Sequence, residues 1–417
     1  MTSNLLTNIV RISSRTSLSR SVSLPALILI LVVLPMHAQT FSSGSDGSDG
    51  AYAPTGTSGT VIVFDPTQFH GSQVAANIFN FTTITIPTGV TVKLSGNTLN
   101  GPVFWLAQGN VDIEGTLDLS GGNGANYTTQ PFDRVPAVPG SGGYIGGVGG
   151  VSSQAALPGS GTGGGAAGTP TVASGGGLFG GNQFLIPLVG GSGGGGGYNP
   201  NNNGIFDAGG GAGGGAIVIA SSTQIVVNGE VNANGGSAGT VSYRSGGGGS
   251  GGAIRLVSNA ITGSGILSAV GGTGSNGGGP NGGLGLVREE STGAFFGGTI
   301  NGTLAESTPF PLLLPTAGPP SAKVISINGT PITPNPSTFP DITINTTSLV
   351  DVVIQTQNIP TTAVLTLTIL DENGVADTVV QAPPLGNCNS SNVCTTTAQV
   401  MFPFGASRGL TRVTWTQ

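Results

Sequence analysis

Charged and aromatic residues are scarce in this sequence. Of its 417 residues only 7% are charged and 6% are aromatic, and Lys93 and Lys323 are the only lysines. Surface helices are normally built from alanine, leucine, glutamate and lysine, and Glu–Lys pairs stabilise them. The composition therefore excludes an ordinary helical or α/β enzyme.

Basic residues are fewer than acidic ones. Seventeen acids against eleven bases give a net charge of -6, and three of the bases, Arg11, Arg15 and Arg20, lie near the start. Proteins that bind nucleic acid present a basic stripe to the phosphates. We therefore expect no nucleic-acid partner.

The N-terminus has the features of a secretory leader. It begins with basic residues and no acids, continues with the apolar run 24–34 and reaches the small residue Ala38. Such a run is shorter than the roughly 20 residues that a membrane span needs. We predict that residues 1–38 are a signal peptide, so that the mature protein is secreted or at the cell surface and has no membrane span. An uncleaved anchor is the alternative.

Cysteine and histidine are nearly absent. Cys388 and Cys394, the only cysteines, share one polar loop, which in an exported protein predicts a local disulfide. His70 is the only histidine outside the leader, and one histidine makes neither a catalytic triad nor a zinc site. Asp46 and Asp49 lie in GSDGSDG, which lacks the spacing of an EF-hand calcium loop. We expect no cofactor and no metal.

Glycine is abundant, and it accompanies a repeat. Residues 121–285 hold 56 of the 77 glycines, without the G-x-y register of collagen. Three phrases recur: VDIEGTLDLSGG from 111, QIVVNGEVNANGG from 224 and ITGSGILSAVGG from 261. Aligned on their closing glycines, they place Leu117, Val231 and Leu267 at equivalent positions.

Apolar and polar residues alternate in these phrases, which indicates strands with one buried face. Short strands of this kind bury their apolar faces by stacking. We predict an all-β chain in which residues 51–305 form a right-handed parallel β-helix. A β-sandwich of the same strands is the alternative, because Asn228-Gly229 is also a hairpin signal. The large excursion 122–213 is expected to be a partly ordered flap.

The composition changes near residue 306. Residues 306–320 are rich in proline and predict a linker, and 39–50 predict a flexible N-terminal segment. In 321–417 glycine becomes scarce and six or seven short alternating segments follow. These predict an antiparallel immunoglobulin-like β-sandwich.

Several phrases carry a resemblance to a known group. GSDGSDGAY, IFNFTTITIPTGVTVKLSGNTLNGPVFWLAQGNVDIEGTLDLSGG, GGGGSGGAIRLVSNAITGSGILSAVGG and LVRE resemble, in order and spacing, a widespread group of bacterial exported glycine-rich repeat proteins. The resemblance covers about residues 41–291. It implies a bacterial, secreted, β-helical scaffold and brings no catalytic residues with it.

Parallel β-helices can carry polysaccharide hydrolases and lyases, so we searched for paired carboxylates. Asp112, Glu114 and Asp118 occupy outward positions of one repeat, and strand geometry puts the first two roughly 7 Å apart. The aligned positions in the next repeat are Val226, Asn228 and Asn232, so no acidic cluster continues. Solvated outer-face residues are therefore the favoured interpretation, and the three acids remain weak candidates for glycan contact.

Aromatic and charged residues elsewhere give two more expectations. Four of the five tyrosines lie in the glycine-rich excursions, and Tyr144 and Tyr198 are the weak glycan-contact candidates among them. Arg288, Glu289 and Glu290 are expected to form surface ion pairs of little energetic weight.

The sequence favours a non-enzymatic exported scaffold or adhesion protein of the bacterial cell envelope or extracellular matrix. Its partners would be polysaccharide or other cell-surface components. A carbohydrate-active enzyme or glycan-binding module on the same fold is the alternative. A concave cleft that combines the acids with tyrosines would favour this alternative.

Overall fold

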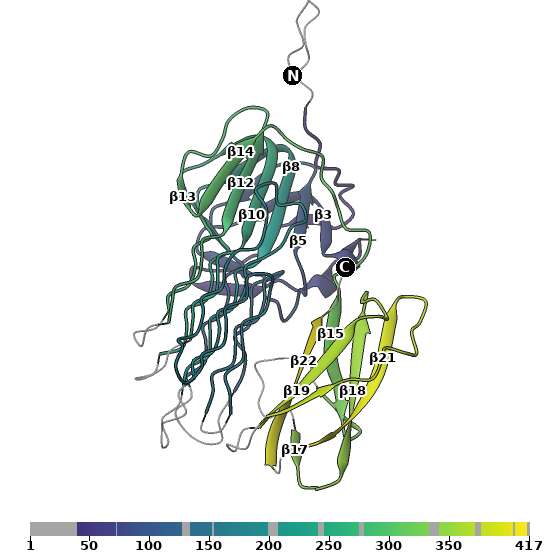
Figure 1. The fold of residues 1–417 in the computed structure, drawn as a ribbon. Helices are drawn as coiled ribbons and strands as arrows, with labels where there is room; N and C mark the ends of the chain where they lie inside the picture. The colour runs from purple at the N-terminus through teal and green to yellow at the C-terminus, as the bar shows by residue number, and fades with distance from the viewer. Residues whose placement is uncertain are drawn as a thin grey trace, which may run out of the picture. The chain divides into compact units, whose positions relative to one another are not determined.

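The computed structural model describes residues 40–71, 73–126, 134–151, 154–198, 207–240, 246–274, 279–332, 342–371, 377–402 and 405–414. These residues are nearly all β, with two short 3-10 helices, η1 (Pro66–Gln68) and η2 (Val74–Ala76). Parallel sheets occupy the N-terminal part and antiparallel sheets the C-terminal part (Figure 1). The predicted signal peptide lies outside the described residues.

Two parallel sheets form the N-terminal part, and successive strands mostly alternate between them. The first sheet has the order β1 (Gly50–Tyr52), β3 (Ile78–Ile86), β5 (Val103–Ala107), β8 (Ala216–Val227), β10 (Ala253–Thr262), β12 (Leu286–Ser291) and β14 (Thr303–Ser307), with β6 (Val111–Ile113) between β3 and β8. The second has the order β13 (Thr299–Asn301), β11 (Ile266–Ser268), β9 (Glu230–Asn232), β7 (Thr116–Asp118), β4 (Val90–Lys93) and β2 (Thr60–Val63).

The repeat alignment gives the strand register. Leu117 pairs with Val231, and Val231 pairs with Leu267, all with no solvent exposure. This confirms the predicted internal ladder. The hairpin favoured by Asn228-Gly229 does not form, because β8 and β9 belong to different sheets. The sandwich alternative for these strands is therefore wrong.

Both faces of the first sheet are buried along the first half of its long strand β8 and along β5. All of β5 and the first six residues of β8 are buried, and period-two alternation begins only further along β8. Trp105 and Ile219 face the core between the sheets, whereas Phe104 and Val218 face a second apolar cluster outside it. Strands buried on both faces read as continuous apolar runs.

Residues 41–50, which we expected to be flexible, instead lie across the first sheet. Phe41 N–H donates to Asn259 Oδ1, Ser43 Oγ donates to the Ala107 carbonyl, and Ser45 Oγ donates to the Phe81 carbonyl. Ser43 N–H also donates to Ser222 Oγ of β8, so the segment crosses β10, β8, β5 and β3 in turn. Glycines with positive φ recur every third residue, at 44, 47 and 50.

The glycine-rich excursions form an array of extended segments joined by backbone hydrogen bonds, which lie side by side in Figure 1. We call these segments the glycine array: 119–125, 137–150, 157–168, 174–178, 190–197, 208–215, 233–239, 246–252, 269–274 and 279–285.

The hydrogen bonds of the glycine array repeat every third residue. The N–H groups of Gly191, Gly194 and Gly197 all donate to segment 208–215, at 2.8 to 2.9 Å, whereas the intervening Gly195 donates to a different segment. A three-residue repeat is typical of polyproline II geometry, which has no hydrogen bonds within a segment. Each segment can therefore bond several neighbours. The described part of the excursion, predicted as a partly ordered flap, is thus held together by backbone hydrogen bonds between its segments.

Two antiparallel sheets of four strands each form the C-terminal part. The orders are β16 (Thr330–Pro331), β15 (Ser321–Ile327), β18 (Leu349–Gln357), β21 (Val393–Met401), and β17 (Ile342–Ile344), β22 (Gly405–Thr414), β19 (Val364–Asp371), β20 (Thr378–Gln381). Their apolar faces form one buried cluster. Cys388 and Cys394 form the predicted disulfide.

Candidate functional site: a groove at the stacked turns

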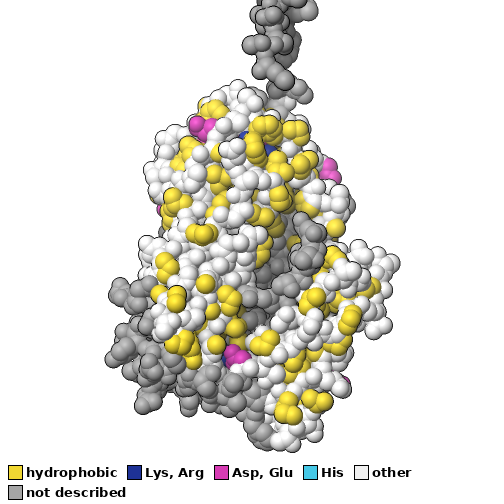
Figure 2. All heavy atoms as spheres, in the orientation of Figure 1, with side chains coloured by type: hydrophobic (Ala, Val, Ile, Leu, Met, Phe, Trp, Pro, Cys, Tyr) yellow, Lys and Arg dark blue, Asp and Glu magenta, His cyan; other side chains and the backbone are white. Residues whose placement is uncertain are grey.

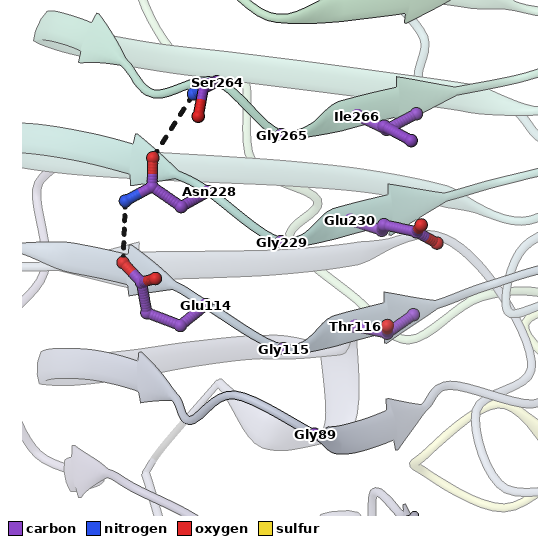
Figure 3. Close-up of a pocket in the computed structure, with 10 residues that line it drawn as sticks. All are labelled: Gly89, Glu114, Gly115, Thr116, Asn228, Gly229, Glu230, Ser264, Gly265 and Ile266. Atoms are coloured by element: carbon purple, nitrogen blue, oxygen red, sulfur yellow. Dashed lines mark hydrogen bonds between the residues drawn. The ribbon is translucent and has the colours of Figure 1, made fainter.

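A stack of glycine turns connects the two parallel sheets. Gly115, Gly229 and Gly265 lie at successive turns (Figure 3). A Cβ at Gly229 would overlap the carbonyl oxygen of Gly115, and one at Gly265 would overlap that of Gly229. Only glycine allows this close stacking, so the repeat leaves the turns without side chains.

Side chains on both sides of these turns form the walls of a groove of about 370 Å³. One wall is a ladder in which Asn228 Nδ2 donates to Glu114 Oε1 at 2.8 Å and Ser264 N–H donates to Asn228 Oδ1 at 3.3 Å. The opposite wall contains Thr116, Glu230 and Ile266 (Figure 3). The groove therefore follows the stacking direction, with polar side chains on each side and glycine backbone at its base.

The backbone at the base of the groove is already bonded. The N–H groups of Gly229, Glu230 and Ile266 donate to carbonyls of the preceding turn at 2.8 to 2.9 Å. A ligand in the groove would therefore be recognised by the side chains of the walls.

Of the predicted glycan-contact residues, only Glu114 lines the groove. Asp112 is the outward residue of β6, between Thr85 and Val226. Burial, and then the charge of Glu114, raises the pKa of Asp112. These two acids are thus electrostatically linked neighbours, as predicted from their spacing.

Asp118 is already engaged by other groups. Its carboxylate lies 3.6 Å from Lys93 Nζ and accepts the N–H of Ser120 at 2.9 Å. Tyr144 belongs to the glycine array and Tyr198 directly follows its segment 190–197. A Cβ at Gly161 would contact the ring of Tyr144, and one at Gly150 the ring of Tyr198. Burial raises the pKa of Tyr144. Neither tyrosine lines the groove, so the predicted candidates do not form one site.

Glu230 is a groove residue that sequence reasoning missed. It occupies the position after the turn glycine, equivalent to Thr116 and Ile266, and its Oε2 accepts from Asn232 Nδ2 at 3.0 Å. The aligned phrases already contained this position. We searched outward positions for pairs within one repeat, however, whereas the groove pairs residues of different repeats.

The prediction that Arg288 and Glu290 form a surface ion pair is wrong about its exposure, because the pair is buried. Both residues are buried, and Glu290 Oε1 accepts from Arg288 Nε at 2.6 Å and from Arg255 Nε at 2.9 Å. Glu290 Oε2 also accepts the N–H of Phe310, and Arg288 lies over the Phe310 ring. The predicted linker therefore covers this cluster. The local sequence around Arg288 and Glu290 could not show that the linker covers these residues.

Glu289 is buried on the opposite face of β12. It pairs in register with Leu256 and Glu306, and it follows a core ladder that includes Trp105 and Ile219. Its Oε2 accepts the N–H of Phe296 at 3.0 Å, while Oε1 is buried with no hydrogen-bond partner. Burial raises the pKa of Glu289 to about 7.

Other features of the described residues bear on ligand classes. They contain no group of three or more His, Cys, Asp or Glu arranged to hold a metal ion, and none of their helices has the length and hydrophobicity of a membrane span. His70 is exposed. Asp49 accepts the N–H groups of Gly71 and Asn80 at 2.8 and 2.7 Å. Tyr127 and Tyr243 lie outside the described residues.

Comparisons with known proteins find no matching family model, no matching curated protein and no matching solved structure. The resemblance to exported glycine-rich repeat proteins therefore stays a prediction.

Proposed function

We propose that this chain is an exported, non-enzymatic scaffold of the bacterial cell envelope or extracellular matrix, which acts through adhesion. The observation that carries the proposal is the glycine array, because its backbone hydrogen bonds join segments far apart in the sequence into one array in which each segment can bond several neighbours. Its central segments, such as 190–197, are buried, whereas outer segments such as 157–168 present backbone and small side chains to their surroundings. Figure 2 shows that charged side chains are few on the face in view.

The proposal includes a finer description of the fold. The alternation of strands between two parallel sheets supports a parallel β-helix, and the two antiparallel sheets support an immunoglobulin-like sandwich. The disulfide supports export, because such bonds persist in oxidising compartments. N-terminal sequencing of the secreted protein should begin at Gln39.

A second candidate, a glycan-degrading enzyme, is favoured by one observation. Burial and the charge of Glu114 raise the pKa of Asp112, and a raised pKa favours the protonated form that a general acid needs.

Pelleting of residues 39–417 with insoluble envelope polysaccharide tests both candidates. The scaffold proposal predicts that the protein pellets with the polymer and that the polymer keeps its chain length. Shortening of the polymer that is lost in Asp112→Asn/Glu114→Gln would favour the enzyme. Absence of pelleting would contradict the scaffold.

A further inference from the structure

We propose that the groove at the stacked turns binds a linear glycan that carries amino groups, aligned with the stack of strands. This inference rests on the proposed function and names the class of polymer that this surface would take. It is carried by three features of the groove: its direction, its bonded base and the charge of its walls.

The direction of the groove fits an extended polymer. Equivalent wall residues recur once per strand step, at a spacing of about 4.8 Å. Glu114, Asn228 and Ser264 therefore form a regular series along one wall. A β-linked pyranose residue advances an extended glycan by a similar length. Successive sugar units would thus meet successive turns.

The backbone at the base of the groove is already hydrogen-bonded, which favours a glycan over an extended peptide as the ligand. An extended peptide that joins a sheet needs free backbone N–H and carbonyl groups. Here the N–H groups of Gly229, Glu230 and Ile266 are bonded to the preceding turn. The wall side chains, in contrast, offer hydroxyl, amide and carboxylate groups, which match the hydroxyl and amino groups of a sugar.

The charge of the walls selects among glycans. Glu114 and Glu230 contribute carboxylates from successive turns. Asn228 and Asn232 each donate to one oxygen of these carboxylates, so the second oxygen of each can accept from a ligand. Asp112 adds a further negative charge next to Glu114. Ammonium groups would be attracted here, and acidic glycans would be repelled.

Binding of a β-1,4-linked glucosamine tetramer to residues 39–417, measured by calorimetry at low salt, tests the inference. We expect Glu114→Gln and Glu230→Gln each to weaken binding about tenfold or more, as expected for a charge-assisted hydrogen bond. Glu306→Gln is the matched control, because Glu306 is an exposed glutamate on β14 that does not line the groove. It should bind as the unaltered chain does.

Two further probes identify the class of ligand. The fully acetylated tetramer and a tetralysine peptide should both bind more weakly than the glucosamine tetramer. Equal binding of tetralysine would mean charge attraction alone and would overturn the glycan assignment. Unchanged affinity in both groove variants, or no binding of the glucosamine tetramer, would also overturn it. The scaffold proposal would still stand if the chain then pelleted with envelope polysaccharide.

Discussion

Glu289 is a buried carboxyl group between Leu256 of the apolar core ladder and Glu306 of the edge strand β14. Burial favours its neutral form, so its pKa of about 7 in the folded protein exceeds the ordinary value of 4.5. Below pH 4.5 the group is neutral in both the folded and unfolded states. Between pH 4.5 and 7 the unfolded chain ionises first, so stability falls as the pH rises through this range.

Glu289→Gln should therefore be as stable as the unaltered protein at pH 4 and more stable at pH 8, by about 3 kcal/mol. Thermal melts at both pH values measure this difference. Equal melting of Glu289→Gln and the unaltered protein at pH 8 would mean that the carboxyl group is not desolvated.

At the scale of residues, the sequence predicted on which face of a strand a residue lies better than whether another segment buries it. The aligned repeats placed Asp112 and Glu114 correctly on the outer side and Val231 inside. They could not place Glu290, because it is covered by Phe310, which belongs to the predicted linker and has no counterpart in the aligned repeats.

The parallel strands are specified by alternation in β7, β9 and β11. Val231 faces the core, whereas Asn232 faces outward with only partial burial. Val231→Asp would bury an unpaired carboxylate and should cost about 3 kcal/mol or more. Asn232→Asp loses the hydrogen bond to Glu230 and places a second carboxylate beside it, so it should cost about 1 kcal/mol, well below the cost of Val231→Asp.

Thermal melts and circular dichroism of these two variants measure the contrast. Since a slip of one residue exchanges the two faces of a strand, the opposite result would mean a different register. Equal tolerance of both would contradict a shared core.

The glycine array is specified by the lack of side chains. A Cβ at Gly194 would overlap the carbonyl oxygen of Gly247, so Gly194→Ala forces two segments apart. We expect a loss of about 2 to 4 kcal/mol in the free energy of unfolding. Gly283→Ala is the matched control in the same array, because its Cβ would lie 3.4 Å from Leu178 Cδ2, an ordinary contact.

Chemical denaturation of both variants measures the effect. A similar, small loss in the two variants would mean that the segments around Gly194 are not closely packed.

At the scale of elements, the strands were predictable and the glycine array was not. Alternating apolar and polar side chains predict strands, as in the phrase around Val231. The array has few side chains to alternate, and its three-residue period lies in hydrogen bonds between segments. The groove was not predicted, because its residues Glu114 and Glu230 come from different repeats and no single repeat shows them together.

For the whole molecule, the proposed scaffold depends on whether the glycine array is ordered in solution. Glycine loses more conformational freedom on folding than any other residue, so an unbonded stretch this rich in glycine would stay mobile. Central segments such as 190–197 and 208–215 instead lie within a network of backbone hydrogen bonds. Such a network would let a chain with few charged residues present a fixed surface to a polymer.

Hydrogen–deuterium exchange of residues 39–417, followed by mass spectrometry of fragments, tests this central claim most directly. Fragments that cover 190–197, 208–215 and 246–252 should exchange as slowly as those that cover β8 and β10, because their N–H groups donate to neighbouring segments. Exchange of these fragments at the rate of an unstructured peptide, while β8 and β10 stay protected, would contradict the account.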